Sequence, residues 1–114
     1  MQITLLKSKI HRATVTDVHL EYEGSLTIDK DLMTIAGIME HEQIQVVNLN
    51  NGARFITYAI TGAKGQIVVN GAAARLALTA DLIIIMAFGS YDEKESKTQR
   101  AKIIRVNELN QPVL

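Results

Sequence analysis

The sequence predicts a mainly β protein that folds as a small closed barrel with one or two short helices. Short runs of β-branched and aliphatic residues recur along the chain. Tight-turn residues, above all Gly and Asn, separate these runs, and helix signals are few. Many short strands would leave exposed sheet edges unless the sheet closed on itself. A closed barrel is therefore the expected architecture.

Composition predicts a single domain that spans residues 1–114. The chain is 47% apolar and 21% charged, with 4% aromatic residues and no Trp, so its core must be aliphatic. Twelve basic residues balance twelve acidic ones, and no basic run is long enough to follow a phosphate backbone. Nucleic acid is not an expected partner.

The absence of Cys excludes disulfides, thiolate metal sites and a Cys nucleophile. The chemistry must therefore use oxygen or nitrogen. His19 and His41 lack ligand spacing, so no metal site is predicted. The longest apolar run, 82–88, is far shorter than a membrane span, and the N-terminal apolar stretch is too short for a secretory signal. We expect a cytoplasmic protein without membrane contact.

The first third of the chain predicts strands that lead to and from a Gly-Ser turn. Residues 2–16 form one or two strands in which Lys9 and His11 share a face, because side chains alternate along a strand. That face could meet a carboxylate or be a solvated edge. Residues 17–22 continue as a strand into Gly24-Ser25, and 26–28 form another.

Asp29 is a predicted N-cap for a helix over 31–36 that ends at Gly37. Asn50-Asn51-Gly52 predicts a type I′ hairpin turn. Residues 82–88 should be a strand buried on both faces, 89–99 a charged loop and 108–114 a flexible tail. Further strands are expected at 43–49, 54–61, 66–69 and 101–106, with a tight turn and about one helical turn at 70–75.

The bond between Gly24 and Ser25 is the candidate reactive feature. A Ser hydroxyl that follows a Gly carbonyl can attack it, because Gly permits the strained backbone that the attack needs. The amide would become an ester. Elimination would then release the upstream segment and leave a dehydroalanine, which hydrolyses to a pyruvoyl group. Gly-Ser alone is usually an ordinary turn, so the neighbouring motifs decide its meaning.

Four segments in this order resemble the pyruvoyl-dependent aspartate 1-decarboxylase family. They are Lys9-Ile10-His11-Arg12, the segment 21–29 around Gly24-Ser25, the segment 50–60 and the segment 69–75. The resemblance runs from about Met1 to Phe88 and is weak after Gly89. It sharpens the expected fold to a double-psi β-barrel, which the pattern of strands alone could not reach.

The resemblance implies self-cleavage between Gly24 and Ser25, a covalently bound pyruvoyl group derived from Ser25, and decarboxylation of L-aspartate to β-alanine for pantothenate and coenzyme A synthesis. When present, the pyruvoyl ketone condenses with a substrate amine and accepts the electron pair left by departing CO2. The resemblance also implies a homotetramer with sites between subunits. Whether cleavage is spontaneous or needs a maturation factor stays open.

Arg54 and Tyr58 are the expected clamp and proton donor. A guanidinium pairs with a carboxylate in a bidentate way, and a phenol can protonate a carbanion. The two residues are four apart in one strand and share a face, whereas Thr57 should point to the other side. Without the resemblance, Arg54 would be an exposed residue beside a turn and Tyr58 a half-buried strand aromatic.

The resemblance extends to other positions. It implies that Thr57 and Asn70 assist cleavage, that Thr57 also contacts substrate, and that a twist, a bulge or a backbone contact brings Thr57 to the site. Second-rank residues near the site are Lys9, His11 and Tyr22. The backbone of three small residues is expected against the substrate, namely Gly71, Ala72 and Ala73.

A second hypothesis is a non-catalytic small β-barrel, used as a binding module and never processed. Fold does not fix function, and such barrels also bind small ligands or DNA. Balanced charge argues against the DNA-binding form. Agreement among four separate motifs favours the enzyme.

Overall fold

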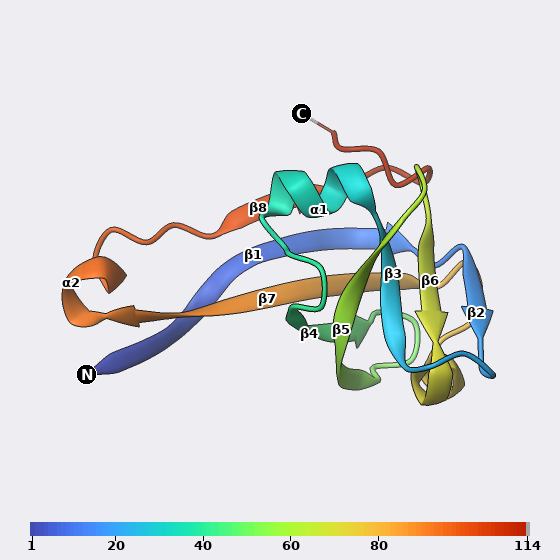
Figure 1. The fold of residues 1–114 in the computed structure, drawn as a ribbon. Coiled ribbons are helices and arrows are strands. Elements are labelled where there is room, and N and C mark those ends of the chain that lie inside the picture. The colour runs from blue at the N-terminus through green and yellow to red at the C-terminus, as the bar shows by residue number, and fades with distance from the viewer. Residues whose placement is uncertain (114) are drawn as a thin grey trace.

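The computed structural model describes residues 1–113, which form one eight-stranded sheet and three short helices (Figure 1). The strands are β1 (Gln2–Thr14), β2 (Asp17–His19), β3 (Ser25–Asp29), β4 (Gln43–Asn48), β5 (Arg54–Gly62), β6 (Ile67–Asn70), β7 (Leu82–Asp92) and β8 (Lys102–Arg105). The helices are α1 (Lys30–Ala36), the 3₁₀ helix η1 (Gly71–Leu76) and α2 (Glu93–Ser96). The mainly β prediction is confirmed.

The order of strands in the sheet is β2-β6-β3-β5-β4-β7-β1-β8. β5 and β6 are consecutive in sequence, yet β3 lies between them, parallel to β5 and antiparallel to β6. This arrangement is a psi connection. The chain from β1 to β2 joins distant positions of the sheet, and the Thr16 N–H donates to the Ile67 carbonyl at 2.7 Å. The sheet therefore curls into a small barrel.

The barrel interior is aliphatic, as the composition predicts. Alternate residues of each strand point inward, so one face is buried in β4 and most of β7. Burying each such side chain contributes roughly 1.5–3 kcal/mol. Fully buried side chains come from several strands and include Ile10, Leu26, Ile28, Ile44, Val46, Ile67, Val69, Ile83 and Ile85.

Both predicted ends of α1 are confirmed. The Asp29 carboxylate accepts from the N–H groups of Asp31 (2.7 Å) and Leu32 (3.4 Å), and Gly37 ends the helix with φ of 72°. The same carboxylate accepts from the Gly65 N–H at 2.7 Å. Asp29 thus fixes the helix and also the turn between β5 and β6, next to the strand that Ser25 begins.

The β4–β5 connection is a hairpin, but its predicted type I′ turn is wrong. Such a turn needs positive φ at two positions, and only Gly52 has it, at 76°. Asparagine side chains hold a longer loop instead. Asn48 Oδ1 accepts from the Asn50 N–H (2.9 Å), and Asn51 Oδ1 accepts from the Ala53 N–H (2.8 Å).

The second half differs from expectation in three further places. β7 is buried on one face and half-buried on the other, so the expected burial of both faces is wrong. Residues 89–92 extend β7, and a capping box between Asp92 and Glu95 starts α2 where a loop was expected.

The expected tail, 108–114, makes specific contacts through residue 113, and residue 114 lies outside the described residues. Asn110 is 1% exposed, and its amide contacts the Thr14 backbone and the Gly65 carbonyl at 2.7–2.9 Å.

No helix within residues 1–113 is long and apolar enough to span a membrane.

Candidate active site

Ser25 is the first residue of β3, where it pairs with Asn70 at the end of β6. The serine is 4% exposed and the asparagine 2%. Asn70 Nδ2 donates to Ser25 Oγ and to Thr27 Oγ1, both at 3.0 Å. The Ser25 hydroxyl lies 3.5 Å from the Glu23 carbonyl oxygen, which is a weak hydrogen bond. Asn70 therefore sets the position of the Ser25 hydroxyl.

Asn70 Oδ1 is buried and has no hydrogen-bond partner among the residues that the structure describes. Leaving a buried acceptor unpaired costs free energy, on the order of 1–3 kcal/mol. Such an unpaired group calls for an explanation, and a catalytic role is one that fits its place here. The position of this acceptor, on the side chain that holds Ser25, marks the site.

Gly71 brings the start of η1 against the peptide that precedes Ser25. Its φ is 74°, and a Cβ there would lie 2.6 Å from Gly24 Cα and 2.7 Å from Gly24 N. Only a residue without a side chain fits both the φ and the close approach. The sequence Asn70-Gly71 thus places one side chain on the Ser25 hydroxyl and one backbone segment on Gly24.

Two clefts flank this peptide. The Ser25 cleft, about 530 Å³, includes Ser25, Thr27, Tyr58 and Asn70 in its lining. The Gly24 cleft, about 310 Å³, is lined by Gly24, Phe55, Ile56, Thr57, Ala72, Ala73 and Leu76. Neighbouring residues of β5 therefore face different clefts on either side of one peptide.

This geometry answers how Thr57 and Tyr58 can both lie near Gly24-Ser25. β5 pairs with β4 in unbroken register from Arg54 to Tyr58, so the expected twist or bulge is not needed. Tyr58 lines the Ser25 cleft, whereas Thr57 and Gly24 line the other cleft. A regular strand reaches the peptide from both of its faces.

Sequence reasoning missed Thr27 and His41. Thr27 accepts from Asn70, and its alternation with Ser25 in one strand was the available signal. The backbone N–H of His41 donates to the Ala59 carbonyl at 2.7 Å. The His41 imidazole lies edge-on to the Tyr58 ring, with ring centroids 5.8 Å apart. No sequence pattern connects position 41 to β5, so only the folded chain reveals this pair.

Three of the expected substrate-binding residues lie outside the two clefts. Arg54 is exposed at the start of β5, and Lys9 and His11 lie on β1, opposite Ile103 and Arg105 of β8. None of the three lines either cleft, whereas Glu21 and Glu23 line the Ser25 cleft. Within one chain, the reactive peptide and the expected cations are therefore separate.

His11 has a lowered pKa, because burial disfavours the charged imidazolium and the positive charges of Lys9, Arg12 and Arg105 repel it. Its Nδ1 is buried without a hydrogen-bond partner in the described part of the chain. We call Lys9, His11, Arg12 and Arg105 the cationic strip. Its charge suits a carboxylate or another anion.

The chemistry available at Gly24-Ser25 is intramolecular acyl transfer. A hydroxyl adjacent to a carbonyl needs no second reactant, and fixed geometry supplies much of the advantage. Asn70 can orient the hydroxyl, and a phenol lies in the same cleft. No group of three or more potential metal-ligating side chains occurs within residues 1–113.

Known proteins resemble this chain over nearly its whole length. The family model described as aspartate decarboxylase matches residues 1–113. The aspartate 1-decarboxylase of Thermoanaerobacter pseudethanolicus is 54% identical over 115 residues, covering 99% of this chain and 98% of that protein. The aspartate 1-decarboxylase of Acetivibrio thermocellus is 57% identical over 112 residues, covering 96% and 89%.

A third relative gives the same result. The aspartate 1-decarboxylase of Leptospira biflexa is 51% identical over 115 residues and covers 98% of each chain. Identity above one half over almost the whole length, together with the match to the family model, leads to one conclusion: this chain belongs to the aspartate decarboxylase family.

Proposed function

We propose that this protein decarboxylates L-aspartate to β-alanine and CO2 after cleaving itself between Gly24 and Ser25. The observation that carries the proposal is the buried Ser25 hydroxyl, held by Asn70 Nδ2 at 3.0 Å next to a Gly24 against which Gly71 packs. Membership in the family favours the enzyme over the alternative of a non-catalytic binding module.

Cleavage begins when Ser25 Oγ attacks the Gly24 carbonyl carbon. The C–N bond breaks, the acyl group moves to oxygen, and an ester replaces the amide. Loss of the Ser25 α-proton then expels the Gly24 carboxylate and leaves a dehydroalanine. Water hydrolyses its enamine, releasing ammonia and leaving a pyruvoyl group at position 25.

The residues around Ser25 fit this reaction. Asn70 orients the hydroxyl, and Gly71 leaves room for the Gly24 backbone to move toward it. In this proposal Thr57, which lines the cleft on the Gly24 side, donates a hydrogen bond to the oxygen of the attacked carbonyl. The buried Asn70 Oδ1 accepts a hydrogen bond from a donor group formed during the reaction.

In the decarboxylation step, the pyruvoyl group supplies the electron sink for the electron pair left at the substrate α-carbon. Tyr58 donates the proton to that carbon from the wall of the Ser25 cleft. Backbone groups of Gly71, Ala72 and Ala73 position the substrate beside Gly24. Each of these roles is a proposal that mutation can test separately.

In this proposal the negative charge of the substrate is balanced by positive side chains from a second copy of the chain. Aspartate brings two carboxylates, and the Ser25 cleft already carries Glu21 and Glu23. Arg54 and Lys9 supply the needed positive charge but, like His11, they lie outside both clefts of their own chain. A homotetramer with sites between subunits brings these residues of one copy to Ser25 of another. We place this enzyme in the cytoplasm, in pantothenate synthesis.

The intact mass of the purified protein tests the proposal. After incubation at raised temperature, we expect two fragments, one ending at Gly24 and one starting at position 25. Their summed mass should equal the whole chain plus one water minus one ammonia. Borohydride in the presence of aspartate should leave the substrate amine attached to the larger fragment.

Serine variants control this experiment. Ser25→Ala should remain one chain without decarboxylase activity, whereas Ser90→Ala, which removes an exposed hydroxyl, should cleave as the parent does. Cleavage or activity in Ser25→Ala would refute the proposal. A parent chain that stays intact alone, but cleaves when a bacterial extract is added, would show that a maturation factor is needed.

A further inference from the structure

The segment 20–24 connects β2 to β3 and carries the carbonyl that Ser25 would attack. All five of its residues are exposed, so burial does little to hold it. Its described contacts are few. The Tyr22 N–H donates to the His19 carbonyl at 3.3 Å, and Gly24 lies against Gly71. A loop with so little packing needs another restraint if its last carbonyl is to stay beside Ser25.

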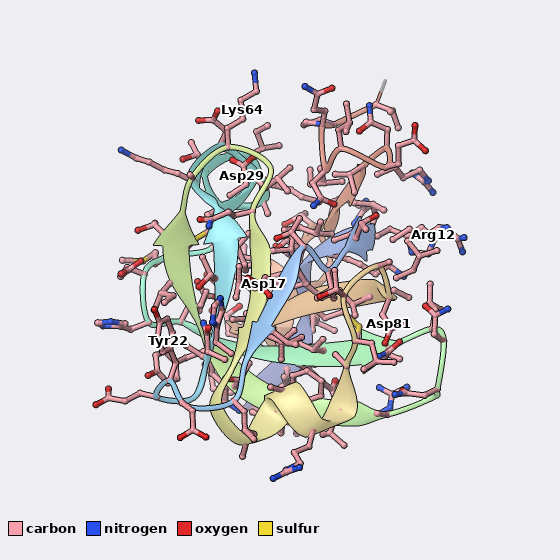
Figure 2. All side chains as sticks on the ribbon, turned by 90° about the vertical axis from the view of Figure 1, so that its right-hand side faces the viewer. Arg12, Asp17, Tyr22, Asp29, Lys64 and Asp81 are labelled. Carbon is pink, nitrogen blue, oxygen red and sulfur yellow. The ribbon has the colours of Figure 1, made fainter. Side chains whose placement is uncertain are left out.

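His19 supplies such a restraint from the end of β2. Its imidazole stacks on the Tyr22 ring, with centroids 4.8 Å apart and planes inclined by 14°. Its Nε2 lies 3.0 Å from Asp17 Oδ2, and Asp17 Oδ1 accepts from the Val18 N–H at 2.8 Å. The strand fixes the carboxylate, the carboxylate orients the imidazole, and the imidazole holds the tyrosine. Figure 2 shows Asp17 on β2 and Tyr22 at the adjoining loop.

The same stack is connected to the reactive serine through β6. His19 is the register partner of Asn70 in the parallel β2–β6 pair, and Asn70 is the partner of Ser25 in the antiparallel β3–β6 pair. The two residues that flank the loop, His19 and Ser25, therefore lie on opposite sides of Asn70 in β6. The Tyr22 carbonyl also approaches Gly71, since a Cβ there would lie 3.0 Å from it.

We propose that His19 is a positioning residue for self-cleavage: oriented by Asp17, it stacks on Tyr22 and holds the loop so that the Gly24 carbonyl stays within reach of Ser25 Oγ. This inference rests on the proposed function. His19 lines neither cleft and touches neither reacting atom, so it acts only through the loop. Small displacements of reacting groups cost large factors in rate, which makes such a restraint effective.

The first test is the rate at which purified precursor converts to two fragments, followed by intact mass. His19→Ala removes both the stack and the ion pair, and should slow cleavage about tenfold. His19→Phe keeps an aromatic ring, and Asp17→Asn keeps the Oδ1 acceptor, so each should slow cleavage only about two- to fivefold. The matched control is Lys30→Ala, an exposed change on α1, which should keep the parent rate.

A double-mutant cycle separates positioning from general stability. If His19 acts through Tyr22, the variant His19→Ala/Tyr22→Ala should cleave no more slowly than Tyr22→Ala alone. Additive slowing, or a failure of His19→Phe to recover rate over His19→Ala, would overturn the proposal. So would a loss of rate that is explained by a matching fall in melting temperature in His19→Ala.

A second measurement does not depend on self-cleavage. In a Ser25→Ala background, which keeps the chain whole, a glutamyl endoprotease can cut after Glu21 and Glu23. Adding His19→Ala should speed these cuts about tenfold, while cutting after exposed Glu108 stays unchanged as an internal reference. Equal rates at the loop with and without His19 would contradict the proposal. An uncleaved parent would count against the proposed function only, because this proteolysis still decides the role of His19.

Discussion

The Ser25 cleft and the cationic strip differ in charge and in the kind of contact that organises them. The cleft is organised by short side-chain hydrogen bonds around Asn70 and is lined by Glu21 and Glu23. The strip gathers positive charge on β1 and β8, and burial together with these charges lowers the pKa of its own histidine. Figure 2 shows Arg12 of the strip and Tyr22 of the cleft on opposite sides of the molecule.

This difference shows how one small barrel can divide the requirements of a decarboxylase. The proposed self-cleavage needs precise geometry within one chain, and β3, β6 and η1 meet around Gly24-Ser25. Binding of a substrate with two carboxylates needs positive charge, which the same chain carries on another surface. A strip of like charges on each chain is unfavourable by itself, and an anion bound between copies would relieve it.

The largest expected effect concerns the proton donor in the Ser25 cleft. Tyr58→Phe should still cleave at the parent rate, because Tyr58 contributes a proton only in the later step. Turnover of aspartate should then fall by about 10²–10⁴, the usual contribution of a general acid. The measurement is the initial rate of β-alanine formation per cleaved chain. Full activity would remove Tyr58 from the donor role.

Gly71 tests whether close approach to Gly24 is required. Gly71→Ala introduces a Cβ about 2.6 Å from Gly24 Cα, so the loop must move and cleavage should slow by on the order of 10². Gly52→Ala is the matched control, because Gly52 has nearly the same φ, 76°, but no heavy atom within 4 Å. Both should lose about 1 kcal/mol of folding stability through backbone strain. Equal cleavage rates would show that the contact has no role.

Mixing subunits tests the separation of the two regions directly. Ser25→Ala should be inactive, and Lys9→Ala should bind aspartate about 10-fold more weakly, as expected for loss of a charged contact. If sites lie between copies, assemblies formed by coexpressing the two variants should be more active at low aspartate than either variant alone. Such hybrids contain sites with an intact Ser25 and an intact Lys9 from different copies. Activity equal to the average of the parents would place both residues in one chain's site.

The smallest expected effect is the contribution of His11 to the pH dependence of folding stability. Its folded-state pKa is lowered from 6.5, first by burial and then by Lys9, Arg12 and Arg105. The unfolded chain therefore binds more protons once the pH falls below about 6.5, so folding stability should drop in that window and be unaffected above it. Denaturant unfolding at pH 7.5 and 5.5 should show this loss in the parent and a smaller loss in His11→Gln. Identical pH dependence in both would assign the loss to other groups.

The sequence predicted local structure best where one residue type determines the outcome. Asp29 and Gly37 mark the two ends of α1 because a capping carboxylate and a residue at positive φ each have a local cause. The Asn50-Asn51-Gly52 turn shows the limit of such reasoning. There, Asn51 Nδ2 donates to the Leu76 carbonyl, and Asn50 Oδ1 accepts from the Leu82 N–H. These bonds, one to the end of η1 and one to the start of β7, override the local preference for a type I′ turn.

The sequence by itself determined the mainly β composition, the aliphatic core and the Gly24-Ser25 bond as the reactive candidate, because each depends on residue type or on neighbours along the chain. Tertiary structure alone decided that Asn70 holds Ser25, that Thr57 and Tyr58 reach one peptide from two clefts, and that His41 lies beside Tyr58. The physical reason is strand pairing. The psi connection places β3 between β5 and β6, and contacts between residues tens of positions apart follow from that register rather than from any local pattern.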